Sequence, residues 1–305
     1  AVRMACATIK AVAITRFCSA SGSSAASVAI KDGVISSSET THVMTYWDLN
    51  LNDQLSEKVL YDALQKPQSD HRLVGTPVPR LDLERKLFGG HSFIQDMVIP
   101  GMQHCRILRA PNRAGRIVNV DEAGFHNRFS DVELLRDGSF IGVIAAREEV
   151  AVAAISYLET LVTWHLPASL PNCADLRTFL TSAPNEQRIV GALAAKAPPP
   201  LGLKRFESWY QRPYIAHASI GPSCALAQWK DNKLEIWSHS QGIYNLKADI
   251  EVYLRREFGD TGMPELVVHH VEGAGCYGHN PADDVAFDVA LLARHAQGRP
   301  LRLLW

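Results

Sequence analysis

The chain has 305 residues, of which 47% are hydrophobic and 21% charged, a composition typical of a globular protein with a sizeable core. Its formal net charge of −1 gives no positive field for nucleic acid or an anionic membrane. Charged residues interrupt every apolar run before it reaches the roughly 20 residues of a membrane-spanning helix. Six scattered cysteines form no Cys-x-x-Cys pair, which argues against a zinc ribbon, a ferredoxin-type cluster or a disulfide scaffold and predicts mostly buried free thiols.

The first half of the chain predicts two structured regions separated by an irregular one. A helix is expected over residues 2–17, followed by a small hairpin that turns at Asp32-Gly33. Residues 40–75 are rich in Asn, Asp, Gln and Pro and are predicted to be irregular connections. Beyond Gly89 the pattern predicts strands SFIQDMVI and HCRILRA, a strand pair within DVELLRDGSFIGVIAA, a helix REEVAVAAISYL and a strand LVTW.

The second half is expected to begin after a linker, KAPPPLGLK, whose three consecutive prolines disfavour helix and sheet. A hairpin of CALAQW and LEIWSHS is predicted next, then an amphipathic helix over residues 242–259 that stops at Gly259. One stripe of that helix is apolar and consists of Ile243, Leu246, Ile250, Leu254 and Phe258. A strand ELVVHHV, a glycine-rich loop, a helix and the strand RPLRLLW complete the predicted elements.

The glycine-rich loop, GAGCYGHNPADD at residues 273–284, is the strongest candidate site. Asn280 suits a helix N-cap and Pro281 the first turn, so three glycines precede a helix N-terminus and can aim backbone N–H groups at a ligand. Three interpretations stay open: a dinucleotide site, a tight turn without a ligand, and a loop that binds an oxyanion or metal-oxo group. No acidic residue follows about 20 residues later, and Asp283 and Asp284 would repel a pyrophosphate, which weakens the first.

Other segments discriminate between these interpretations. They are LVGTPVPRLDLERKLFGGHSFIQDMVIPGMQHCRILRAP, LLRDGSFIGVIAAREEVAVAAISYLETLVTW, PYIAHASIGPSCALAQW, LEIWSHSQGIY, HVEGAGCYGHNPADDVAFDVALLA and GRPLRLLW. In order and spacing they resemble the molybdopterin-binding large subunits of the xanthine dehydrogenase and aldehyde oxidase family, in the branch of bacterial isoquinoline oxidoreductase, nicotinate dehydrogenase and aldehyde dehydrogenase. The resemblance implies an α+β fold with four regions: a partial domain at 1–71, an α/β hammerhead-like domain at 72–165, a linker at 166–204 and the first part of a molybdopterin-binding domain at 205–305.

The resemblance also assigns residues to the cofactor. The family's loop donates a backbone N–H to an oxo ligand on molybdenum, and the matching donor position here is Cys276. The loop around the metal and pterin would be completed by Gly273, Gly275, Tyr277, Gly278, His279 and Asn280. Gln241, in HSQG, matches the glutamine that hydrogen-bonds the metal centre, and no residue is expected to ligate the metal directly. Relatives of the xanthine type have an acidic residue in place of Asn280, so a purine substrate is not expected.

By this resemblance the chain is part of the catalytic subunit of a molybdenum hydroxylase that oxidises an aldehyde or an N-heterocycle with water as the oxygen source. The implied cofactor is molybdenum-molybdopterin in its cytosine dinucleotide form, with [2Fe-2S] clusters on a small iron–sulfur subunit and a cytochrome c as electron acceptor. The family's catalytic glutamate has no counterpart before Trp305. We therefore expect a fragment or a split subunit, inactive until the remainder of the molybdopterin-binding subunit joins it.

An alternative is that the chain is a non-catalytic assembly or docking subunit of the same kind of complex. A glutamate in a glycine-rich context beyond Trp305 would favour the catalytic interpretation, whereas a genuine stop codon would favour a split subunit. Relatives of this branch are often exported, which favours the periplasm over the cytoplasm, although the chain carries no export signal.

Overall fold

The structure is a computed structural model that describes residues 1–49, 59–167, 173–188, 190, 201–213, 215, 217–278 and 284–305. The chain divides into two compact units, Ala1–Leu81 and Asp82–Trp305. Helices combine with mixed parallel and antiparallel sheets, which confirms the predicted α+β class. Among the described residues, no helix is both long enough and apolar enough to cross a membrane. The four predicted domain ranges stay a prediction.

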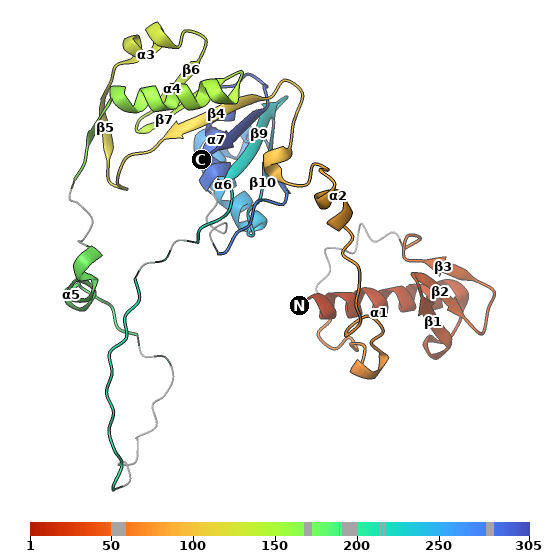
Figure 1. The fold of residues 1–305 in the computed structure, drawn as a ribbon. Helices are drawn as coiled ribbons and strands as arrows, with labels where there is room; N and C mark the ends of the chain where they lie inside the picture. The colour runs from red at the N-terminus through yellow and green to blue at the C-terminus, as the bar shows by residue number, and fades with distance from the viewer. Residues whose placement is uncertain are drawn as a thin grey trace. The chain divides into compact units, whose positions relative to one another are not determined.

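In the first unit a long helix lies along a small antiparallel sheet (Figure 1). The elements are α1 (Val2–Ser21), β1 (Val28–Lys31), β2 (Val34–Ser37) and β3 (Val43–Thr45), with 3-10 turns η1 (Ala25–Ser27) and η2 (Gln68–Asp70). The helix is longer than predicted and ends at Gly22, whose φ of 73° suits a glycine C-cap. Asp32 and Gly33 form the predicted hairpin turn, both with positive φ. The sequence did not predict β3.

The second unit is built on one seven-stranded sheet with the order β11-β10-β9-β12-β4-β7-β6. Its strands are β4 (Gln103–Leu108), β6 (Glu133–Asp137), β7 (Phe140–Ala145), β9 (Cys224–Lys230), β10 (Lys233–Ser238), β11 (Glu265–His270) and β12 (Leu301–Leu304). The pairs β10–β11 and β12–β4 are parallel, and the others are antiparallel. Strands from residues 72–165 and from residues 205–305 therefore share one sheet. The strands β5 (Arg116–Val120) and β8 (Val162–His165) form a separate ribbon.

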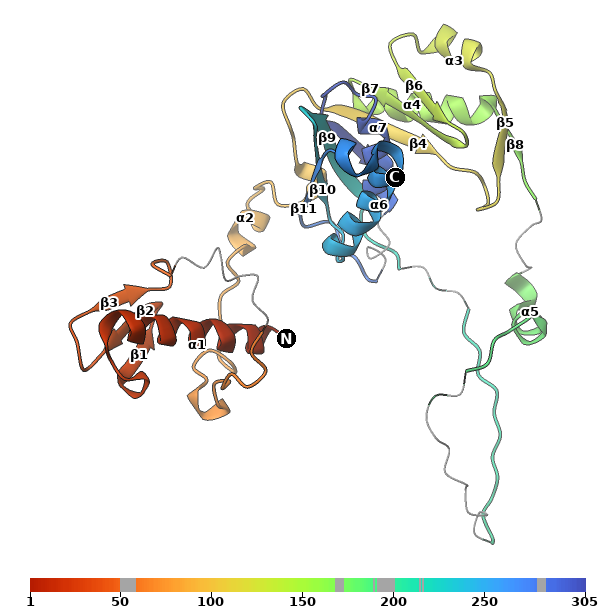
Figure 2. The same cartoon turned by 180° about the vertical axis from the view of Figure 1, so that it is seen from behind.

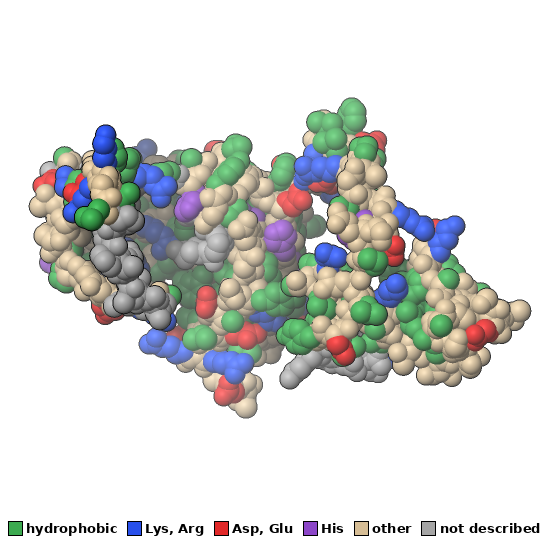
Figure 3. Space-filling view, turned by 90° about the horizontal axis from the view of Figure 1, so that it is seen from below, with side chains coloured by type: hydrophobic (Ala, Val, Ile, Leu, Met, Phe, Trp, Pro, Cys, Tyr) green, Lys and Arg blue, Asp and Glu red, His purple; other side chains and the backbone are tan. Residues whose placement is uncertain are grey.

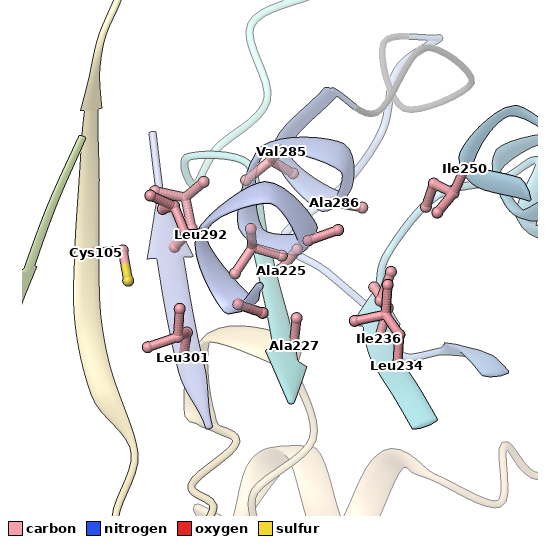
Figure 4. Packing of buried hydrophobic residues seen from close by; sticks show 14 of the residues in the cluster. Cys105, Ala225, Ala227, Leu234, Ile236, Ile250, Val285, Ala286, Leu292 and Leu301 are labelled. Carbon is pink, nitrogen blue, oxygen red and sulfur yellow. The ribbon is translucent and has the colours of Figure 1, made fainter. Parts of the chain in front are cut away.

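Helices cover both faces of this sheet (Figures 1 and 2). One core contains α6 (Ile243–Gly262) and α7 (Asp284–Ala293), and another contains α4 (Glu148–Leu161). Because successive residues of a strand point to opposite faces, Ala225 and Ala227 pack under α7, whereas Leu226 belongs to a third cluster on the other side. Figure 4 shows the α7 side of this core, where Val285, Ala286 and Leu292 lie over β9 and β12.

The predicted apolar stripe of the helix at 242–259 is confirmed. Leu246, Ile250 and Leu254 are buried, and each contributes about 1.5–3 kcal/mol through removal of its side chain from water. Ile243 and Phe258 are partly buried against the same core. At Gly259 the backbone leaves the helical region with φ 71°, and one further helical turn follows before the helix ends at Gly262.

The strand predicted at residues 92–99 is wrong. Those residues contain a short 3-10 helix, η3 (Ile94–Asp96), because local hydrogen bonds compete with strand pairing. The carboxylate of Asp96 accepts hydrogen bonds from the backbone N–H groups of Ser92 and Phe93, at 3.4 and 3.2 Å. The N–H of Ile94 donates to the carbonyl of Glu272 at 2.7 Å, which fastens η3 to the segment after β11.

Four further short elements connect these larger ones. They are α2 (Leu83–Leu87), α3 (Glu122–Arg128), η4 (Cys173–Asp175) and α5 (Leu176–Ser182). The helix α3 was not predicted, although Asp121 before it is an ordinary helix N-cap residue. The Asp121 carboxylate caps it by accepting a hydrogen bond from the N–H of Gly124 at 2.8 Å.

The prediction that the cysteines are mostly buried is wrong. Among the five for which the structure describes the side chain, only Cys105 and Cys224 are buried; Cys6 is exposed, and Cys18 and Cys276 are half-buried. None of these five forms a disulfide. The exposed and half-buried thiols lie on α1 and in the glycine-rich loop.

Candidate functional site

The candidate residues after β10 and after β11 meet at one edge of the sheet. The two strands are parallel, with Trp237 opposite His269 and Ser238 opposite His270. The N–H of Val271 then donates to the carbonyl of Ser238 at 2.9 Å, so the chains stay side by side as the strands end. Because parallel strands end at the same edge, the turn that contains Gln241 and the loop at 273–278 leave the sheet next to each other. In open sheets of parallel strands, ligands bind outside the carboxyl ends of the strands, and the parallel pair β10–β11 of this mixed sheet offers the same arrangement.

The turn after β10 presents the predicted glutamine at the surface. Ser238, His239 and Ser240 are buried, and two hydroxyl groups shape the backbone. The N–H of Ser240 donates to Ser238 Oγ at 3.0 Å, and the N–H of Gly242 donates to Ser240 Oγ at 3.1 Å. The side chain of Gln241 between them is exposed, immediately before α6 begins. The buried serines therefore hold the turn, while the amide of Gln241 remains accessible to a ligand.

The glycine-rich loop folds back on itself through residues with positive φ. The φ angles are 106° at Gly275, 53° at Tyr277 and 97° at Gly278. Positive φ is uncommon for a residue with a side chain, so Tyr277 requires support from its surroundings. Its ring packs against Gly275, where an added Cβ would lie 2.6 Å from the ring. Only glycine fits at this position, because both the backbone angle and the aromatic ring exclude a side chain.

The other side of the loop rests on the buried His239 and on the largely exposed segment from His217 to Gly221. A Cβ at Gly273 would lie 2.5 Å from Nδ1 of His239, and one at Gly278 would lie 3.1 Å from the ring of His217. The side chain of Ala274 packs against Gly221, where an added Cβ would lie 2.8 Å away. The loop glycines thus serve close packing within the protein as well as any ligand.

Three polar contacts hold the loop, two at Glu272 just before it and one at Cys276. Ser219 Oγ donates to the carbonyl of Cys276 at 3.5 Å. At the start of the loop, the carboxylate of Glu272 forms an ion pair with Lys86 of α2, and the Glu272 carbonyl accepts the hydrogen bond from η3. Segments that are remote in sequence therefore fix the loop at its start and at Cys276.

The loop retains backbone donors that a ligand could use. Within the described part of the chain, the N–H groups of Gly275, Tyr277 and Gly278 form no hydrogen bond with the protein. Successive N–H groups in a folded-back loop are suited to an oxyanion or to a metal-oxo group. The donor set therefore fits the oxygen-rich cofactor that the sequence resemblance implies. The predicted residues His279 and Asn280 lie outside the described residues.

In the ranges that the structure describes, no group of three or more His, Cys, Asp or Glu side chains converges as a metal site would require. Cys276 is half-buried in the loop, and His279 is not among the described residues.

His239 is the residue that sequence reasoning missed. It lies 34 positions before Gly273, and only the parallel pairing of β10 with β11 brings the two into contact. The available signal was its place in HSQG, two residues before the predicted glutamine. His217 and Gly221 fall within a segment that carries the family resemblance, but their contacts with the loop depend equally on the fold.

No family model matches the chain. It is 35% identical over 291 residues to a nicotinate dehydrogenase subunit of Pseudomonas putida, a match that covers 90% of this chain and 23% of that protein. The chain thus spans about a quarter of the length of this curated relative.

Two solved structures share the fold. The quinoline 2-oxidoreductase of Pseudomonas putida 86 superposes with a TM-score of 0.52 and 18% identity over 76% of this chain and 34% of that one. A Cu,Mo-CO dehydrogenase superposes with a TM-score of 0.53 and 14% identity over 76% and 35% of the two chains. The sequence match and the shared fold confirm the resemblance to the molybdopterin-binding large subunits of the xanthine dehydrogenase and aldehyde oxidase family, and this chain corresponds to part of such a subunit.

Proposed function

We propose that this chain is part of the catalytic, molybdopterin-binding subunit of a molybdenum hydroxylase that oxidises an aldehyde or an N-heterocycle with water as the oxygen source. One observation carries the proposal. The parallel strands β10 and β11 place the Gln241 turn and the glycine-rich loop at the same edge of the sheet, and these are the segments that the resemblance assigns to the metal centre. The 35% identity to the nicotinate dehydrogenase subunit supports an N-heterocycle in particular.

The residues of the site would hold the cofactor from one side. The proposed contacts are the backbone of Gly273, Gly275, Cys276, Tyr277 and Gly278, the side chain of Gln241, and His279 and Asn280 beyond the described residues. The cofactor, molybdenum-molybdopterin in the cytosine dinucleotide form, supplies the redox centre that takes two electrons from the substrate.

The chain's own part is to orient that cofactor. The N–H donors of the loop would hold its oxygen atoms through hydrogen bonds that are already in place before the reaction, so no reorganisation opposes the transition state. The Gln241 amide has both donors and an acceptor and would fix the cofactor from the neighbouring turn. The catalytic glutamate of the family belongs to the remainder of the subunit in this proposal.

Electron transfer requires further partners. We place [2Fe-2S] clusters on a small iron–sulfur subunit and a cytochrome c as the final acceptor, since the chain offers no Cys-x-x-Cys pair that could hold a cluster itself.

Metal and pterin analysis of the purified native complex tests the proposal. Molybdenum and pterin in stoichiometric amounts are expected in a preparation that oxidises an N-heterocycle or an aldehyde. An active preparation that contains neither molybdenum nor pterin would overturn it.

A further inference from the structure

His239 lies between three parts of the candidate site. It follows β10 directly, its side chain is buried, and the residue is only 5% exposed. Its Nε2 accepts a hydrogen bond from the N–H of Cys224, the first residue of β9, at 3.2 Å. Burying a polar ring is unfavourable unless its nitrogen atoms are paired, and this hydrogen bond pairs Nε2.

The same ring is in close contact with the glycine-rich loop. A Cβ at Gly273 would lie 2.5 Å from Nδ1, 2.7 Å from Cγ and 2.8 Å from Cβ of His239. These distances show that the backbone of Gly273 lies directly against the root of the imidazole. Any displacement of the ring therefore displaces the start of the loop, because close-packed interiors transmit strain.

The Gln241 turn is tied to the same residue. His239 lies between two buried serines, and the N–H of Ser240 is held by the hydroxyl of Ser238. Gln241 follows one residue later, and the N–H of Gly242 is held by the hydroxyl of Ser240. The backbone of His239 thus belongs to the turn that presents Gln241, while its ring touches the loop.

The hydrogen bond also determines the protonation state of the ring. A backbone N–H can only donate, so Nε2 must offer its lone pair and the ring proton must reside on Nδ1. His239 is therefore a neutral acceptor in the folded protein, with one defined ring orientation.

We infer that His239 is the positioning residue that sets the glycine-rich loop and Gln241 in one geometry toward the molybdenum cofactor. The role toward the cofactor rests on the proposed function. The coupling of the His239 ring to the loop and to strand β9 does not depend on that function. His239 touches the loop rather than the cofactor, and it acts through Gly273 and through the β9 strand.

Hydrogen exchange measured by mass spectrometry on the complete complex tests the coupling. His239→Ala should accelerate exchange of the amides in residues 273–278 about two- to tenfold, the range expected when one hydrogen bond is lost. His239→Gln keeps an acceptor for the Cys224 N–H and should restore wild-type exchange. His270→Ala removes an exposed imidazole from the adjacent strand and should leave loop exchange unchanged. Equal exchange in wild type and His239→Ala would overturn the inference.

A second variant keeps the inference testable if His239→Ala fails to assemble. Gly273→Ala pushes a methyl group against the ring, so it should accelerate exchange of the Cys224 amide, which lies on another strand. Where His239→Ala does assemble, adding Gly273→Ala to it should have a much smaller effect on exchange of the Cys224 amide, because the hydrogen bond from that amide to the ring is already lost. A Cys224 amide that does not respond to Gly273→Ala would contradict the coupling.

A spectroscopic measurement on the same samples separates this inference from the proposed function. The electron paramagnetic resonance spectrum of the molybdenum centre should change in His239→Ala and match wild type in His239→Gln and His270→Ala. A wild-type complex that contains no molybdenum would overturn the proposed function. The hydrogen-exchange results would still test whether the His239 ring is coupled to the loop and to Cys224. If the complex contains molybdenum but His239→Ala changes neither its spectrum nor the exchange of the loop amides, the inference about His239 is wrong and the proposed function stands.

Discussion

At the scale of single residues, packing within the protein explains the loop glycines but does not explain Gln241. Gly273 and Gly275 are required for packing, against His239 and Tyr277 respectively. The side chain of Gln241 is exposed, and no packing explains its place between two buried serines and a helix start. A polar side chain that is presented in this way at the carboxyl end of parallel strands is better explained by a ligand than by stability.

Gln241→Ala should therefore impair activity without destabilising the fold. We expect activity of the complete complex to fall about 10- to 100-fold, the range seen when residues that orient a metal centre are removed. The free energy of unfolding should change by less than about 0.5 kcal/mol, as for other exposed positions. Asn245→Ala, exposed in the first turn of α6, is the matched control and should retain activity. Steady-state kinetics and thermal unfolding measure both quantities; wild-type activity in Gln241→Ala would exclude the proposed role.

At the scale of elements, an ion cluster joins β4, β12 and α4. The carboxylate of Glu148 accepts hydrogen bonds from Arg106 at 2.8 Å and from Arg302 at 3.0 Å. The hydrogen bond from Arg106 is the main reason that the pKa of Glu148 lies below its ordinary value. Burial, with the nearby Arg302 charge, lowers the pKa of His104 in the same cluster. Both shifts make the folded state bind protons less readily than the unfolded chain.

The stability of this region should consequently decrease with acidification in two steps. The His104 contribution decreases as the pH falls through about 6.5, and the Glu148 contribution decreases as the pH falls through about 4.3 toward the lower folded pKa. Glu148→Gln should lower the midpoint of thermal unfolding at pH 7, and the difference from wild type should narrow below about pH 4.3. Glu149→Gln, at the exposed neighbouring position, is the control and should show little effect. If the difference in unfolding midpoint between wild type and Glu148→Gln stayed constant with pH, the lowered pKa of Glu148 would be contradicted.

Elements with a strong local signal were predictable. The hairpins at Asp32-Gly33 and Lys230–Lys233 and the α6 stripe follow from turn residues and helical periodicity. The strand predicted around Ile94 failed because Asp96 captures the local N–H groups, a competition that alternation of apolar residues does not reveal. The β5 strand was missed because its partner β8 lies on the far side of α4 in the chain.

The segments of the candidate site were predictable from the sequence, but their arrangement in space was not. The glycine-rich loop and Gln241 were found from motif and resemblance, and their assignment to the cofactor stays a prediction. Their adjacency depends on the parallel pairing of β10 with β11, which sequence spacing does not specify. For the same reason His239 was not predicted, because its contacts with Cys224 and Gly273 cross between strands.

At the scale of the whole molecule, much apolar surface is exposed. Hydrophobic side chains reach the surface at many places in the space-filling view (Figure 3). After the proline linker, Phe206, Trp209 and Tyr210 are 87%, 81% and 91% exposed. Exposed aromatic residues in such density mark interaction surfaces. Since the chain corresponds to about a quarter of its curated relative, the remainder of such a subunit is the partner we propose for this surface.

Co-expression tests this partner. The chain alone should bind the dye ANS and aggregate, and expression together with the remainder of the subunit should abolish both effects. The triple variant Phe206→Ser/Trp209→Ser/Tyr210→Ser should reduce dye binding by the chain alone and weaken its association with the remainder. Changing Lys204, Arg205 and Glu207 to Ser, exposed in the same segment, is the control for any general effect of substitution there. Equal association of both variants with the remainder would contradict the proposed surface.

The most direct test of the account is the position of molybdenum in crystals of the native complex. An anomalous difference map recorded across the molybdenum absorption edge should show a peak at the sheet edge where β10 and β11 end, beside the Gln241 amide and the N–H groups of residues 275–278. A molybdenum peak remote from both segments, in a complex that is active, would contradict the assignment of this edge as a wall of the metal site.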